Sequence, residues 1–217
     1  RYSLRALHYS NLFYQLDCLS GQGYCSKESF EALWRELGWT AKDDLKIKDW
    51  QNIKRKYNQK IQLPITAEKT SLPARFEGLM IWAQVRQAAM NSPDRQSLLE
   101  NLALTLQPQD AEALADIIFH FEQRFFGWWD LKGQPLAESG ANTFAEQLQT
   151  TGLANLIEQA SLFYQAELSQ NSILEFNFIA RPDLGKNTTT NGEQVNNQSL
   201  IEIKENAQIL NQIDVVI

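Results

Sequence analysis

The spacing of the apolar residues changes once along this chain of 217 residues, and that change limits the folds that it can adopt. As far as about Leu168 the apolar residues recur every three or four positions, which is typical of amphipathic helices. From Ser172 the repeat becomes two residues, which is typical of strands. The sequence therefore predicts an α+β protein, predominantly α-helical, with a small two-strand element near its C-terminus.

The helical part divides at turn and cap residues. Ser26 is placed as an N-cap, and Ser92 with Pro93 is expected to open another helix as cap and first helical position. Gly133 to Gly140 is expected to be a break between helices. The predicted helices are those around Tyr9 to Leu16, Ser26 to Leu37, Ala41 to Gln62, Phe76 to Met90, the one after Ser92, Pro108 to Trp128, and Thr143 to Leu168.

The two predicted strands are joined by a long polar segment. One strand runs through Leu174 to Ala180, and the other contains Ile201 and Ile203. Pro182 to Gln198 is too polar to pack and too long for a tight turn, so it is expected to be a mobile flap or a disordered excursion. We divide the chain into a helical domain, residues 1–168, and a strand-containing segment, residues 169–217.

Composition excludes two kinds of partner. The net charge of −6 leaves no basic field for a nucleic acid, and the basic run Lys54, Arg55 and Lys56 is expected to be a solvated helix face. No window approaches the ~18 apolar residues that a membrane span needs. The remaining partners are a peptide or another protein, and the oligomeric state is not indicated.

The cysteines and the chain ends suggest how the protein is processed. Cys18 and Cys25 flank a glycine-containing turn, so we expect a local disulfide that would stabilise the fold by roughly 2 to 3 kcal/mol. Two ordinary thiols are the alternative. With Arg1 in first place, a disulfide favours an exported or periplasmic protein over a cytoplasmic one. The aliphatic ending at Ile217 predicts a truncated chain, whose next element is missing.

The last fifty residues resemble a known enzyme family. A pair of strands followed by Ile213-Asp214-Val215-Val216-Ile217 is similar to the lead-in to the active-site helix of gluzincin zinc metallopeptidases. In that family the segment runs into His-Glu-x-x-His, which binds zinc and polarises the attacking water. The resemblance implies that residues 169–217 begin an incomplete peptidase-like domain. It also implies a substrate-edge strand that pairs with peptide backbone, formed here by Ser199, Leu200, Ile201, Glu202, Ile203 and Lys204.

The chain itself lacks the residues for this chemistry. A catalytic zinc site takes three protein ligands, and the two histidines, His8 and His120, share no motif. Asp116, His120 and Arg124 are instead expected to form an ion-paired polar stripe on one helix. We therefore expect no cofactor in this chain, zinc only in a longer parent protein, and no catalysis by the chain as it stands.

Four large aromatic residues form the other candidate site. Phe125, Phe126, Trp128 and Trp129 cover most sides of a helix end, so they cannot all face one core. They are expected either to pack against the helix from Thr143 to Leu168 or to form an interaction patch for a ligand. Two functions remain: the scaffold and substrate-edge portion of a zinc metallopeptidase-like protein, or a non-enzymatic helical module that binds a protein or peptide.

Overall fold

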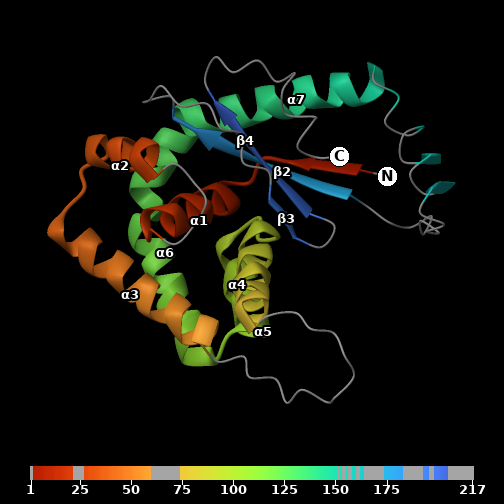
Figure 1. Cartoon of the computed structure of the whole chain (residues 1–217). Helices are drawn as coiled ribbons and strands as arrows, with labels where there is room; N and C mark the ends of the chain where they lie inside the picture. Colours follow the sequence, from red (N-terminus) through yellow and green to blue (C-terminus); the bar gives the residue numbers. More distant parts are fainter. Residues whose placement is uncertain are drawn as a thin grey trace, which may run out of the picture.

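The computed structural model describes residues 2–21, 27–59, 74–150, 174–182, 193–195 and 198–204, with isolated positions between 152 and 163. Figure 1 shows their arrangement. The helices are α1 (His8–Leu19), α2 (Lys27–Glu36), α3 (Ala41–Gln59), α4 (Ala74–Met90), α5 (Arg95–Thr105), α6 (Pro108–Trp128), the π-helical turn η1 (Trp129–Gly133) and α7 (Gln134–Thr150). The strands are β1 (Tyr2–Arg5), β2 (Leu174–Arg181), β3 (Glu193–Val195) and β4 (Gln198–Lys204).

The predicted fold class is confirmed, and the sheet is larger than expected. Its four described strands have the order β1-β2-β4-β3, in which β2 is parallel to both neighbours and β3 is antiparallel to β4. β2 and β4 are the two predicted strands. β3 lies inside the polar segment from Pro182 to Gln198, so that segment is not irregular throughout.

The first strand of the sheet comes from the other end of the sequence. β1 pairs with β2 from Tyr2 opposite Leu174 to Arg5 opposite Asn177. Four residues are too few to show an alternating pattern, which is why the sequence did not predict this strand. Phe176 and Phe178 of β2 belong to the same hydrophobic core as the helices, so the boundary placed after residue 168 does not separate two cores.

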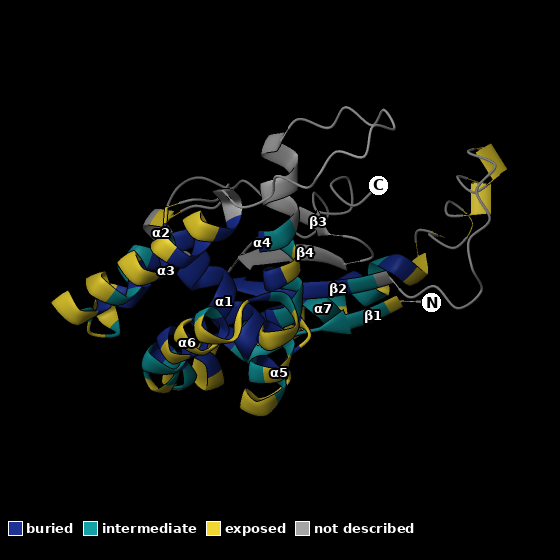
Figure 2. Ribbon diagram, turned by 90° about the horizontal axis from the view of Figure 1, so that it is seen from below, coloured by how far each residue is buried: buried dark blue, intermediate teal, exposed yellow. Residues whose placement is uncertain are grey.

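α1 is the central helix of the molecule. All its residues from Tyr9 to Leu19 are buried, and it contacts α2, α3, α4, α6 and β2. Figure 2 shows it in dark blue, with exposed faces on the helices around it. The sequence predicts an amphipathic helix here, whereas polar residues of α1 are also buried. Among them, Asn11, Gln15 and Asp17 hydrogen-bond to neighbouring elements.

α6, η1 and α7 form one continuous helical path, so the predicted break from Gly133 to Gly140 is wrong. α7 begins at Gln134 rather than at Thr143, and it packs on the sheet through the ring of Phe144, which lies 5.0 Å from that of Phe176 and 5.6 Å from that of Phe178. Gly152, just after α7, has a φ of 65°. The rest of the helix predicted as far as Leu168 lies largely outside the described residues.

Two predicted helix starts can be compared with the structure. α6 begins with Pro108 at its first turn, as expected. α5 is capped by Asp94 rather than by Ser92: the Asp94 carboxylate accepts from the Ser97 backbone N–H at 2.8 Å. Ser92 donates to the Ala88 carbonyl instead, at the end of α4. The predicted cap at Ser26 lies outside the described residues.

Candidate functional site

The predicted substrate-edge strand, Ser199 to Lys204, is β4, and it is an edge over only part of its length. β2 pairs with all of β4, from Glu175 opposite Gln198 to Arg181 opposite Lys204. On its other side, β3 covers Gln198 to Leu200. Among the described strands, Ile201, Glu202, Ile203 and Lys204 therefore have a partner on one side only, while Ser199 and Leu200 have one on each side.

β2, which supports β4, is held by a side chain as well as by β1. β1 stops pairing at Asn177, and beyond that point the buried side chain of Asn11 in α1 takes over. Its amide nitrogen donates to the Phe178 carbonyl at 3.0 Å, and its oxygen accepts from the Ala180 N–H at 2.7 Å. Asn11 thus satisfies the β2 backbone where no strand is available.

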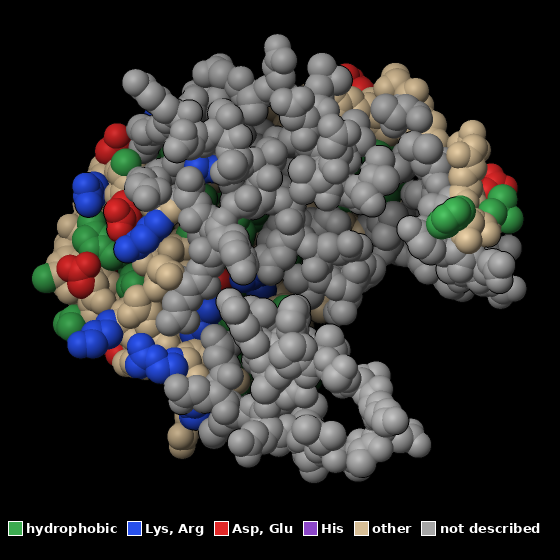
Figure 3. Space-filling view, viewed as in Figure 1, with side chains coloured by type: hydrophobic (Ala, Val, Ile, Leu, Met, Phe, Trp, Pro, Cys, Tyr) green, Lys and Arg blue, Asp and Glu red, His purple; other side chains and the backbone are tan. Residues whose placement is uncertain are grey.

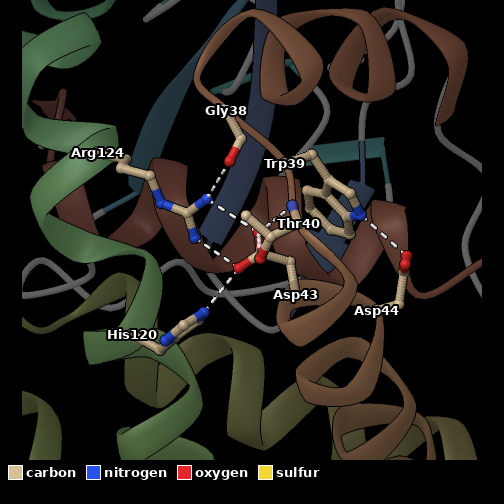
Figure 4. A network of polar contacts seen from close by, with 7 residues as sticks. All are labelled: Gly38, Trp39, Thr40, Asp43, Asp44, His120 and Arg124. Atoms are coloured by element: carbon tan, nitrogen blue, oxygen red, sulfur yellow. Dashed lines mark hydrogen bonds and ion pairs between the residues drawn. The ribbon is translucent and has the colours of Figure 1, made fainter.

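Asp43 lies at the centre of a network that joins α3 to α6 (Figure 4). Its buried carboxylate accepts from the backbone N–H of Thr40 at 2.6 Å and from the Thr40 hydroxyl at 2.8 Å. Arg124 donates to both carboxylate oxygens, at 2.6 and 2.9 Å, and His120 Nε2 lies 2.6 Å from one of them. Arg124 also donates to the Gly38 carbonyl at 2.9 Å.

The partners of Asp43 in this network stabilise its charged form. Burial alone would raise the pKa of Asp43, but hydrogen bonds from Arg124, His120 and Thr40 outweigh it and hold the pKa well below its usual value. The predicted ion-paired stripe is found only in part: His120 and Arg124 are ion-paired, both with Asp43 of α3. Asp116 is exposed and takes no part in these contacts. The sequence did not show that the partner would be an aspartate on another helix.

A second buried carboxylate, Asp17 of α1, binds α3 and α4. Lys54 Nζ lies 2.6 Å from Asp17 Oδ1, and Arg86 lies 3.1 Å from Oδ2. The indole N–H groups of Trp50 and Trp82 donate to Oδ1 at 3.2 and 3.0 Å. Burial opposes the charge on Asp17, but Lys54 and Arg86 lower its pKa below the usual value.

The position of Lys54 corrects the prediction of a solvated basic face. Its side chain is 5% exposed, and burial lowers its pKa, although Asp17 partly offsets this. Arg55 is exposed, and Lys56 forms an ion pair with Asp110 of α6. The three residues therefore point to different surroundings and form no common basic surface.

The four aromatic residues at the end of α6 do not form an interaction patch. Phe125, Trp128 and Trp129 are buried, and Phe126 is half-buried. Phe125 stacks on Trp129 at 5.7 Å, and the rings of Trp128 and Trp129 pack against Gly133, where the path turns into α7. Of the two alternatives, these aromatic residues therefore pack against a neighbouring helix, and that helix is the start of α7.

A cavity of about 480 Å³ opens between α2 and α3. The apolar residues that line it are Leu19, Trp39 and Ile47. Its polar lining comes from Lys27, Glu31 and Arg35 of α2 and from Asp44, Lys48 and Gln51 of α3. Figure 3 shows basic and acidic side chains close together over this part of the molecule. Nothing in the sequence indicated this cavity, because it depends on how two helices diverge.

The remaining predictions concern metal and disulfide bonding. In the described ranges, no three His, Cys, Asp or Glu side chains come together in a way that could hold a metal ion. Cys18 is buried at the end of α1, and Cys25 lies outside the described residues, so their pairing stays a prediction. No helix in the described part of the chain is long and apolar enough to cross a membrane.

Comparison with known proteins gives no relative for this arrangement. No protein-family model matches the chain, and no curated protein or solved structure matches it either.

Proposed function

We propose that this chain is the scaffold and substrate-edge portion of a zinc metallopeptidase-like protein, and that the half of β4 from Ile201 to Lys204 pairs with the backbone of an extended peptide. The one-sided pairing of these residues among the described strands carries the proposal. A strand edge offers backbone N–H and C=O groups to an added strand, which supplies affinity without dependence on one side-chain sequence.

The surroundings of β4 support this role because they make the edge rigid. β2 pairs with β4 over its full length, and it is itself fixed by β1 and by the Asn11 side chain. Phe144 of α7 packs on Phe176 and Phe178 from one face of the sheet. A preformed edge loses little conformational freedom when a peptide binds, which favours binding.

In the part of the chain that the structure describes, no group of side chains fits a zinc site. His120 contacts the Asp43 carboxylate, whereas the ring of His8 packs against that of Phe126, with the ring centroids 5.0 Å apart. The two histidines therefore have different neighbours. In the proposal, the metal and its ligands belong to residues that follow Ile217, as the resemblance implies. We assign no catalytic step to the present chain.

The enzyme part of the proposal is tested by reading the gene beyond Ile217 and by measuring the zinc content of the full-length protein. Reading the frame beyond Ile217 is expected to give His-Glu-x-x-His, and the full-length protein is expected to contain about one zinc per chain. A frame that stops, or that continues without this motif, would rule out the peptidase and leave the non-enzymatic peptide-binding module.

The strand-edge part is tested separately, by amide exchange with an extended probe. We expect the peptide acetyl-Thr-Val-Thr-Val-Thr-amide to slow hydrogen exchange within Ile201 to Lys204, because an added strand takes up free backbone groups. The same peptide with alternate backbone nitrogens methylated is the control, since it cannot form that ladder. Equal effects of the two peptides, or no change in β4, would refute strand addition whatever the reading frame shows.

A further inference from the structure

The cavity between α2 and α3 is a second binding feature, independent of the strand edge. α2 packs on α1, whereas α3 packs on α4 and α6, and the two helices diverge from the corner formed by Gly38, Trp39 and Thr40 (Figure 1). We propose that this cavity binds a short acidic peptide segment that carries an apolar side chain.

The apolar part of the cavity is rigid. Leu19 and Ile47 are 5% and 7% exposed, and both belong to the hydrophobic core. Trp39 is stacked on Phe121 with ring centroids 5.7 Å apart, and its indole N–H donates to Asp44 at 2.9 Å. An apolar side chain that enters here meets a preformed apolar surface, which is the usual basis of small-ligand sites.

The charges around the cavity favour an anion. Its described lining residues include three cations, Lys27, Arg35 and Lys48, against two carboxylates. Glu31 is shared between Lys27 at 2.9 Å and Arg35 at 3.8 Å, and Asp44 is occupied by Trp39. The excess is therefore positive, in a chain whose net charge is −6.

Arg35 and Lys48 are the residues best placed to bind a carboxylate. Both are exposed, and the side chain of Arg35 is 76% exposed, so it can reorient towards a ligand. A guanidinium can bind a carboxylate through two parallel hydrogen bonds, which makes Arg35 the stronger candidate. The volume of about 480 Å³ suits a segment of a few residues rather than a whole helix.

The test compares two probe peptides of the same shape by calorimetry: acetyl-Glu-Leu-Phe-Glu-amide and acetyl-Gln-Leu-Phe-Gln-amide. We expect the acidic peptide to bind about tenfold more tightly at low salt. Its glutamates can form charge pairs with Arg35 and Lys48, and such pairs are stronger at a partly enclosed site and at low salt. The double variant Arg35→Gln, Lys48→Gln is expected to remove the preference.

The matched control removes the same charges from outside the cavity. Lys42→Gln with Arg55→Gln changes one lysine and one arginine, both exposed on α3 and neither part of the described lining. This variant is expected to keep the preference. Equal affinity for the two peptides, no binding of either, equal losses in the two double variants, or NMR shifts on β4 rather than on α2 and α3 would each overturn the proposal.

Discussion

Asn11 shows how one side chain can stand in for part of a strand. β1 leaves the sheet after Arg5, and the chain turns into α1, so beyond Asn177 the side of β2 that faces away from β4 is no longer paired with β1. The NH2 group of Asn11 donates to the carbonyls of Phe178 and Leu7, and its amide oxygen accepts from the N–H of Ala180.

Replacing Asn11 should therefore be costly. We expect Asn11→Ala to lower the free energy of unfolding by about 2 to 4 kcal/mol, because it leaves two buried backbone groups without partners. Asn52→Ala, on the exposed side of α3, is the control and should change stability by less than about 0.5 kcal/mol. Urea unfolding of the three proteins measures this, and equal stability of the two variants would contradict the assigned role of Asn11.

His8 gives the fold a dependence on pH. Burial lowers its pKa below the ordinary value of 6.5, and the charges of Glu122, Asp130 and Asp94 offset only part of this. The unfolded chain therefore binds the proton more readily than the folded one. The contribution of His8 to stability is at its maximum above pH 6.5 and is lost as the pH falls from there through the folded pKa.

The corresponding prediction is a comparison between two proteins. Between pH 7.5 and pH 5.5, roughly one unit on either side of the ordinary pKa, we expect His8→Gln to lose less stability than the wild type. Denaturant unfolding at both values measures the difference, and the other titrating groups cancel in it. A variant that loses as much as the wild type would show that His8 does not contribute.

At the scale of single residues, the sequence predicts pairing better than it predicts burial. Of the predicted stripe Asp116, His120 and Arg124, the last two are ion-paired on one helix face, as residues four apart can be, but Asp116 is not part of these contacts. Lys54 was wrongly placed in solvent, since its partner Asp17 is 37 positions away. The burial of Phe125 and Trp129 likewise depends on neighbours that the local pattern does not contain.

At the scale of elements, the turn η1 between α6 and α7 depends on a glycine. A Cβ atom on Gly133 would lie 2.7 Å from ring atoms of both Trp128 and Trp129. Because those rings are buried, they have little room to move. The close approach at Gly133 allows the helical path to continue from α6 into α7 without a break.

Two glycine substitutions should therefore have opposite effects. We expect Gly133→Ala to destabilise the protein by about 1 to 3 kcal/mol through overpacking. Gly127→Ala, within α6, should instead stabilise it by about 0.5 to 1 kcal/mol, since an added Cβ there meets nothing within 4 Å. Thermal unfolding of both variants checks this, and the same sign of change in the two would contradict the assignment.

The sequence predicts most helices and misses the two short strands β1 and β3 for the same physical reason. Helices such as α3 and α6 carry many turns of a regular pattern, so their bounds are close to those expected. β1 has four residues, and its partner is about 170 positions away, so nothing local marks it as a strand. The half-covered edge of β4 follows from pairing with β3, which the sequence also does not show.

At the scale of the whole molecule, Asp17 joins helices from three parts of the chain. Its carboxylate is shared by Lys54 and Trp50 of α3 and by Arg86 and Trp82 of α4. We expect Asp17→Asn to lower the free energy of unfolding by about 3 to 5 kcal/mol, because it removes a negative charge that two buried cations, Lys54 and Arg86, contact directly.

An exposed ion pair provides the control for Asp17. Glu31→Gln affects Lys27 and Arg35 on the surface of α2 and should cost less than about 1 kcal/mol. Guanidinium unfolding of both variants, followed by tryptophan fluorescence, gives the comparison. Similar losses in the two would show that Asp17 is not the junction described here.

The parallel pairing of β1 with β2 has a consequence for synthesis on the ribosome. Synthesis runs from the N-terminal side, so Tyr2 to Arg5 are made before their partners Leu174 to Asn177, which come about 170 residues later. At a synthesis rate of ~5 to 20 residues per second, β1 remains without its partner strand for on the order of ten seconds or more. α1 to α7 can pack during that time, while the sheet closes last, and a chaperone that covers β1 would have that interval in which to act.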